Sequence, residues 1–320
     1  MFDRNFTFTS EQFKKYSDDY LTPNGRVCTW EFCYLFFQEK FDLFKNNKAT
    51  EEDWIRAELE LGSYLATYGM YRGSGDLMDF NRTVYKPVIQ ELFKVANNKK
   101  LQPYQSNIEP DVIIELVDAI SNGFKNVKIG EKYIKPTKIL TTKILMGVFA
   151  CLPAFDSLLS KALAQFKKNE PKYSLIKLLN TDLKKGPPTW SHFAREEGVI
   201  NFFDKLRPTF KTSKKDFLYP LMRTIDLYFW FWGMDLLKQE QANKHNCLTF
   251  EILKMLGEGS EYSAQSLADK LNMYRKEKIS AQSITSSLKI IQNKSGRVIS
   301  TQKKGRMLWR IHSVDIIDNH

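Results

Sequence analysis

Several common catalytic signatures are absent from this 320-residue sequence. It has no GxxxxGK[ST] loop to hold nucleotide phosphates, no GxGxxG after a strand, no HExxH pair and no CxxC spacing. Its few cysteines and histidines are scattered, so we expect a reduced compartment, no sequence-evident zinc site and no cofactor. They are Cys28, Cys33, Cys151, Cys247, His192, His245, His312 and His320.

Long apolar runs are also missing. No stretch reaches the roughly 18 apolar residues that a bilayer-spanning helix needs. The first residues, MFDRNFTFTSEQFKK, lack the order of basic and then apolar residues that is typical of a secretion signal. We therefore expect a cytoplasmic protein without a membrane partner.

The composition is that of a folded and basic protein. Hydrophobic residues make up 42% of the chain, which argues against disorder, and the length allows one large and one small domain. The 48 Lys and Arg exceed the 37 Asp and Glu by 11. An excess of this kind favours polyanionic partners, although a lysine-rich composition by itself is weak evidence for one.

The first three quarters of the sequence have helical periodicity. The segment ATEEDWIRAELELGSYLATYGM shows the pattern: Thr50 precedes three acids, as at a capped helix start, and Trp54, Ala57, Leu61 and Leu65 fall on one face. Almost no strand alternation is visible before residue 240. Residues 1–240 are therefore predicted to form an all-α domain.

The pattern changes after a polar stretch, residues 241–246, which we interpret as a linker. Three short helices follow, the second opened by Ser263 and the third by Ser280. VISTQ and MLWRI then alternate as two strands of a hairpin. This order resembles a winged-helix DNA-binding domain over residues 247–312. The predicted fold class is mainly α, with a small α+β winged-helix domain at residues 247–320.

The charges of this region fit that resemblance. Seven cations and no acid lie between Lys278 and His312. In winged-helix proteins the third helix usually enters the major groove and the wing contacts phosphate or the minor groove, which implies a double-stranded DNA partner. The alternative is a protein-docking module with a solvated basic wing. The residues predicted to contact DNA are Gln282, Ser283, Ser286, Lys289, Lys294, Arg297, Lys303, Lys304, Arg306 and Arg310.

A second resemblance concerns KPTKILTTKILMGVFACLPAFDSLLSKAL, residues 135–163. Here Lys138 follows a Pro–Thr turn and begins an apolar helix, and a second turn places Asp156 at the start of the next helix. This order resembles the helix-hairpin-helix DNA glycosylases. The resemblance implies that Asp156 supports the cationic sugar in the transition state and that Lys138 is the amine that attacks the sugar.

Other interpretations of these segments remain open. An aspartate at a helix start is most often only a cap. Lys143 is a second candidate amine, or alternatively a solvated lysine on the helix surface. Arg72, in the loop of residues 67–76, is a candidate phosphate ligand with the backbone amides beside it, or part of a plain helix-ending loop. The aromatic stretch LYFWFWG, residues 227–233, is either a base-stacking pocket or core.

Together these features predict a DNA-binding protein. The most concrete hypothesis is a glycosylase-like enzyme that removes a damaged or modified base from duplex DNA. The alternative is a non-catalytic transcriptional regulator whose helical domain senses a ligand or dimerises. The sequence leaves the oligomeric state and the recognised base open.

Overall fold

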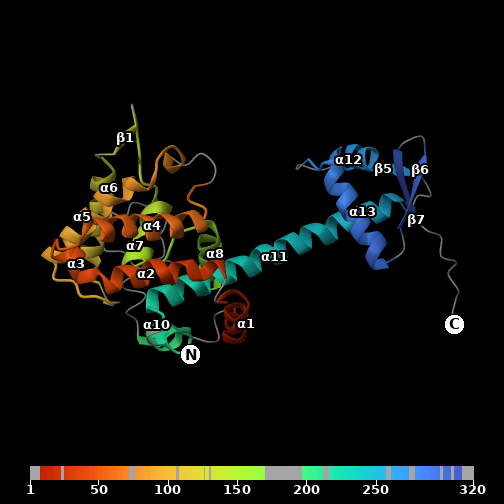
Figure 1. Ribbon diagram of the computed structural model, residues 1–320. Coiled ribbons are helices and arrows are strands. Elements are labelled where there is room, and N and C mark those ends of the chain that lie inside the picture. The colour runs from red at the N-terminus through yellow and green to blue at the C-terminus, as the bar shows by residue number, and fades with distance from the viewer. Residues whose placement is uncertain are drawn as a thin grey trace. The chain divides into compact units, whose positions relative to one another are not determined.

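The computed structural model describes most of the chain, which divides into two compact units, Met1–Leu236 (unit 1) and Leu237–His320 (unit 2). Both units are mainly helical (Figure 1). The described residues are 8–22, 25–71, 76–105, 108–125, 127–129, 131–169, 197–211, 216–256, 261–273, 278–295, 298–303 and 306–311.

Unit 1 is built from helices, with two short antiparallel ribbons among them. We had predicted an all-α domain; the two ribbons are additional, and their strands of two or three residues are too short to show as alternation in the sequence. The described helices are α1 Ser10–Tyr20, η2 Arg26–Cys28, α2 Thr29–Glu39, α3 Phe41–Lys45, α4 Glu51–Thr67, η3 Asp76–Asp79, η4 Arg82–Val84, α5 Tyr85–Asn98, α6 Pro110–Lys125, α7 Lys138–Val148, α8 Ser157–Asn169, α10 Glu197–Asp204 and the first part of α11 Leu221–Leu256, which continues into unit 2. The ribbons are β1 Lys128–Ile129 with β2 Lys132–Tyr133, and β3 Thr209–Lys211 with β4 Asp216–Leu218.

Helix α4 forms as the sequence predicts. Thr50 accepts a hydrogen bond from the backbone of Asp53, and the Asp53 side chain accepts one from the backbone of Thr50, which together make a capping box. The apolar face that begins at Trp54 is buried throughout. The start of this helix and its buried face were therefore predictable from the local sequence alone.

Aromatic rings fill much of the core of unit 1. Phe44 lies 4.8 Å from Trp54 between ring centroids, and Phe41 lies 5.2 Å from Phe93, which joins α3 to α4 and α5. The aromatic stretch of α11 is also core, because Tyr228 and Phe231 are fully buried against α1. The base-stacking interpretation of residues 227–233 is therefore wrong.

Unit 2 contains the last part of α11, then β5 Tyr262–Ser263, α12 Ala264–Asn272, α13 Ala281–Ser295, β6 Val298–Lys303 and β7 Arg306–Ile311. The strands form one sheet in the order β5-β7-β6 (Figure 1). The predicted hairpin is confirmed, with Ser300 opposite Trp309 in register. Trp309 is buried, so it packs in the core of this unit.

Residues 241–246, which were predicted as a linker, form part of helix α11. The helix continues because the sequence from Met234 to Leu256 contains neither glycine nor proline. Its polar residues, such as Gln, Glu and Lys, are good helix formers. The polar composition of residues 241–246 was interpreted as a break between two helices. The two later helix starts are confirmed, since Ser263 and Ser280 accept hydrogen bonds from Ser266 N and Ser283 N.

Candidate functional site

Asp156 and Lys138 lie at the starts of two helices of unit 1. Thr137 caps α7 by accepting a hydrogen bond from Leu140 N, and Lys138 is the first residue of that helix. Asp156 caps α8, because its Oδ1 accepts hydrogen bonds from Leu158 N at 3.1 Å and Leu159 N at 3.0 Å. The capping role of Asp156 is thus present in the structure, and its catalytic role stays a prediction.

The two helix starts are tied together. Thr142 Oγ1 donates to Lys138 O at 2.9 Å and accepts from Phe155 N at 3.1 Å. The Lys138 ammonium lies 4.9 Å from the centroid of the Phe155 ring, and Phe155 directly precedes Asp156. Partial burial lowers the pKa of Lys138. The structure therefore places Lys138 in the neighbourhood of the Asp156 turn, with a weakened preference for the charged amine.

Lys143 is buried, in contrast to the expectation for a helix lysine. Only 4% of it is exposed, and its Nζ donates to Tyr68 O at 2.7 Å. Burial lowers its pKa, while the charges of Asp156 and Asp226 act in the opposite direction. The solvated interpretation is wrong because α7 is buried on nearly all sides. Lys143 is thus the amine whose charge is coupled to Asp156.

A buried ion pair on α11 completes this cluster. Arg223 Nη1 lies 2.6 Å from Asp226 Oδ2, with 1% and 6% of the two side chains exposed. Arg223 Nη2 donates to Tyr68 Oη at 2.7 Å, and Asp226 Oδ1 accepts from Ala154 N at 2.8 Å. The guanidinium carbon lies 4.9 Å from the centroid of the Trp30 ring. This pair was not predicted from the sequence, although two opposite charges three residues apart in an apolar stretch are a recognisable pattern for a buried ion pair.

Glycines let the helices of the cluster approach closely. A Cβ at Gly233 of α11 would lie 2.1 Å from the carbonyl oxygen of Leu158, so only glycine allows α8 to pack there. A Cβ at Gly147 of α7 would lie 2.8 Å from the Tyr64 ring of α4. These contacts bring α4, α7, α8 and α11 together around the charges. Two buried donors of the cluster, Arg223 Nε and Tyr64 Oη, have no hydrogen-bond partner among the residues that the structure describes.

The stability of the cluster is expected to depend on pH. Burial raises the pKa of Asp226 to about 6 from an ordinary value of 3.8, although Arg223 opposes the shift and Asp156 adds to it. The contribution of a group with a raised pKa is fully present below the unfolded value and is lost as the pH rises through the folded value. The free energy of unfolding of wild type relative to Asp226→Asn should therefore grow by about 2 kcal/mol between pH 7 and pH 4.

Urea unfolding of the wild type and Asp226→Asn at pH 7, 5.5 and 4 measures this difference. Parallel pH profiles of the two proteins would show that Asp226 titrates near its ordinary value in the folded chain. The comparison cancels the carboxyl groups that do not interact with Asp226, because both proteins contain them.

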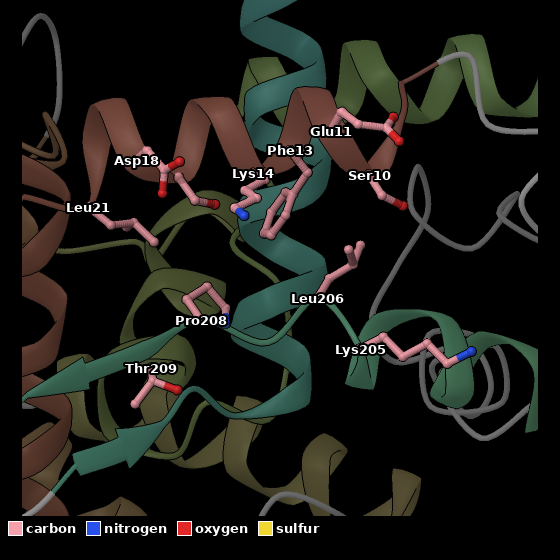
Figure 2. Close-up of a pocket in the computed structure, with 11 residues that line it drawn as sticks. Ser10, Glu11, Phe13, Lys14, Asp18, Leu21, Lys205, Leu206, Pro208 and Thr209 are labelled. Atoms are coloured by element: carbon pink, nitrogen blue, oxygen red, sulfur yellow. The ribbon is translucent and has the colours of Figure 1, made fainter.

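A cavity of about 730 Å³ lies elsewhere in unit 1, between α1 and the segment that follows α10 (Figure 2). Its size is within the range of small-molecule sites. Figure 2 shows Phe13 and the amine of Lys14 pointing from α1 toward Leu206 and Pro208. None of the site residues predicted from the sequence lines this cavity. The full lining is Ser10, Glu11, Phe13, Lys14, Ser17, Asp18, Leu21, Lys205, Leu206, Pro208 and Thr209.

In unit 2, the polar residues predicted on α13 share its exposed face. Ile284 and Leu288 are buried in the core of unit 2, while Lys289 is exposed. Arg310 on β7 is exposed as well, and Lys303 pairs with Arg306 in register at the end of the ribbon. The other exposed members of the α13 face are Gln282, Ser283 and Ser286.

Not every predicted DNA contact can be placed. Lys294 belongs to α13, within the helix bounds. Arg72, Arg297 and Lys304 lie outside the described residues, so their predictions stay predictions.

Within the described part of the chain, no helix is long and apolar enough to cross a membrane. The same residues hold no group of three or more His, Cys, Asp or Glu side chains that could bind a metal ion. Comparison with protein-family models, with curated proteins and with solved structures finds no match to this chain.

Proposed function

We propose that the protein binds double-stranded DNA through unit 2, as a winged-helix domain whose helix α13 enters the major groove. The observation that carries the proposal is the split between the two faces of α13. Its buried face packs on the core of unit 2, and its exposed face carries polar side chains, Lys289 and one apolar side chain, Ile290, without any acid. A helix with such an outer face has the size and chemistry to contact phosphates and base edges.

The order of elements supports the winged-helix assignment. A helix is followed by a strand, two helices and two strands, and the first strand pairs with the last, giving β5-β7-β6. In winged-helix proteins this arrangement places the third helix against the duplex and the last two strands as a wing. Strand β5 is short, with the two residues Tyr262–Ser263.

The polar side chains of α13 divide into donors and acceptors. Ser286 Oγ donates to Gln282 O at 3.0 Å, so its hydroxyl proton is used inside the helix and its lone pairs remain as acceptors. Lys289 provides a charged donor for phosphate, and the Gln282 amide can bond an adenine edge through both of its groups. The face therefore offers phosphate binding and a limited means of base recognition.

The salt dependence of duplex binding tests the proposal. Lys289→Gln combined with Arg310→Gln should lower the slope of log affinity against log salt by about two, because each lost phosphate contact removes about 0.9. Lys254→Gln is the matched control, since Lys254 is an exposed lysine of unit 2 on α11. Equal slopes for the double variant and the control would refute contact through α13 and the wing.

For unit 1 we propose removal of a base from the bound duplex. The geometry that supports this activity is the link between Lys138 and the Asp156 turn. A carboxylate at a helix N-terminus is favoured as an anion and can stabilise the cationic sugar that forms when the C1′–N bond breaks. The neutral amine of a partly desolvated lysine can attack C1′. The net effect of the site is a raised pKa of Asp156, because burial outweighs the hydrogen bonds from Leu159 N and Leu158 N and the charge of Lys143, which favour the anion.

The second candidate function is a ligand-sensing DNA-binding regulator. The cavity between α1 and Thr209 favours it, because the cavity combines apolar residues with two amines, two carboxylates and hydroxyl groups at the size of small-molecule sites. An operator-binding regulator usually works as a two-fold dimer with spaced half-sites. A monomer in solution, measured by sedimentation of the full chain, would count against this function.

A further inference from the structure

A lysine-rich ribbon lies between α6 and α7 of unit 1. Residues 125–138 contain five lysines and a single acid, Glu131. Strands β1 and β2 pair in this segment, with Lys128 opposite Tyr133 and Ile129 opposite Lys132. Lys128 and Lys132 lie on the two strands, and the other three lysines lie in the segments directly before and after them.

The ends of the ribbon are held by the core of unit 1. Phe124, at the end of α6, is fully buried, and Ile134, directly after β2, is 2% exposed. Val127 packs against the same core. Because both ends are anchored, the paired strands β1 and β2 are attached to unit 1 on both sides.

The ribbon displays an aromatic ring beside cations. Tyr133 is 46% exposed. Directly opposite residues of antiparallel strands share one face, so Lys128 lies on the same face as Tyr133. The Nζ atom of Lys135 lies 5.1 Å from the centroid of the Tyr133 ring, where the ring attracts the cation. An exposed ring flanked by lysines is the combination that binds a single-stranded backbone and stacks an unpaired base.

We propose that the β1–β2 ribbon is a binding surface for single-stranded nucleic acid. Lys128 and Lys135 bind phosphates, and Tyr133 stacks on one base. This inference rests on the proposed function in one respect, that the partner is a nucleic acid. The duplex is assigned to unit 2, and the single strand is assigned to this ribbon. The ribbon leads directly into α7, whose first residue is Lys138. A strand bound there runs toward the helix start that is tied to the Asp156 turn.

The test measures the affinity of the full chain for a fluorescent 12-nucleotide oligothymidylate and for a 12-base-pair duplex by anisotropy. Tyr133→Ala should weaken binding of the single strand about tenfold, because stacking of one base contributes roughly that much. Tyr133→Phe keeps the ring and should keep the affinity. Lys128→Gln combined with Lys135→Gln should lower the single-strand salt slope by about 1.4.

Two control variants match these changes in unit 1. Phe32→Ala removes an aromatic side chain that is 62% exposed, and Lys48→Gln removes an exposed lysine outside the ribbon. Neither should change single-strand binding. Single-strand affinity that is unaltered in Tyr133→Ala and in the double lysine variant would overturn the inference.

The two proposals can fail separately. If Lys289→Gln with Arg310→Gln leaves duplex binding intact while Tyr133→Ala weakens single-strand binding, the proposed role of unit 2 fails and the ribbon assignment stands. The reverse result removes the ribbon assignment and leaves the role of unit 2 supported.

Discussion

Arg223→Leu is expected to lower the free energy of unfolding of unit 1 by about 3–5 kcal/mol. The substitution leaves the buried carboxylate of Asp226 without its ionic partner and takes the donor away from Tyr68 Oη. It also removes the cation beside the Trp30 ring. Whole domains have a free energy of unfolding of only about 5–15 kcal/mol, so this one substitution should remove a large part of it.

Urea unfolding followed by tryptophan fluorescence measures the effect. The double variant Arg223→Leu with Asp226→Leu should recover much of the loss, because an apolar pair can replace a buried ion pair at little net cost. Arg56→Leu is the matched control: Arg56 pairs with Glu60 at 3.5 Å but is 64% exposed, and should change stability by less than about 1 kcal/mol. A loss equally small in Arg223→Leu would mean that the buried pair does not hold α11 in place.

Asp156→Asn is expected to abolish base removal while leaving the fold and duplex affinity nearly unchanged. Asparagine caps helices as well as aspartate does, so the hydrogen bonds from Leu158 N and Leu159 N are kept. The negative charge that would support the cationic sugar is lost, which should cost at least about a hundredfold in rate.

The assay incubates the protein with duplexes that carry damaged, methylated, hydroxymethylated or glucosylated bases and then cleaves abasic sites with alkali. Asp53→Asn serves as control, because Asp53 also takes part in capping a helix but lies in the box that opens α4. Strand breaks that persist in Asp156→Asn would remove Asp156 from the mechanism, whereas intact DNA across the whole panel would favour the regulator.

Local features of the structure were predictable from the sequence. Thr50, Ser263 and Ser280 were recognised as helix caps because capping depends on the side chain and the next three residues. The hairpin of unit 2 was recognised because alternation with a period of two reports a half-buried strand directly. In each case the signal and the structure that it specifies lie within a few residues of each other.

Features that depend on packing between distant segments were not predictable. Lys143 is buried because α7 is surrounded by other helices, and the sequence of α7 alone does not reveal its neighbours. The Arg223–Asp226 pair is stabilised by Tyr68 and Ala154, which lie 155 and 72 residues away from their partners in the chain. The continuity of α11 was missed because a polar stretch was taken for a break although nothing in it stops a helix.

The most direct test of the central claim is a titration of the full chain onto a fluorescent duplex at salt concentrations between 50 and 200 mM. If α13 and the wing bind phosphates, the affinity should fall steeply with salt, roughly fortyfold over this range for three contacts. The absence of binding at 50 mM, or an affinity that does not change with salt, would contradict duplex binding through the basic face of unit 2.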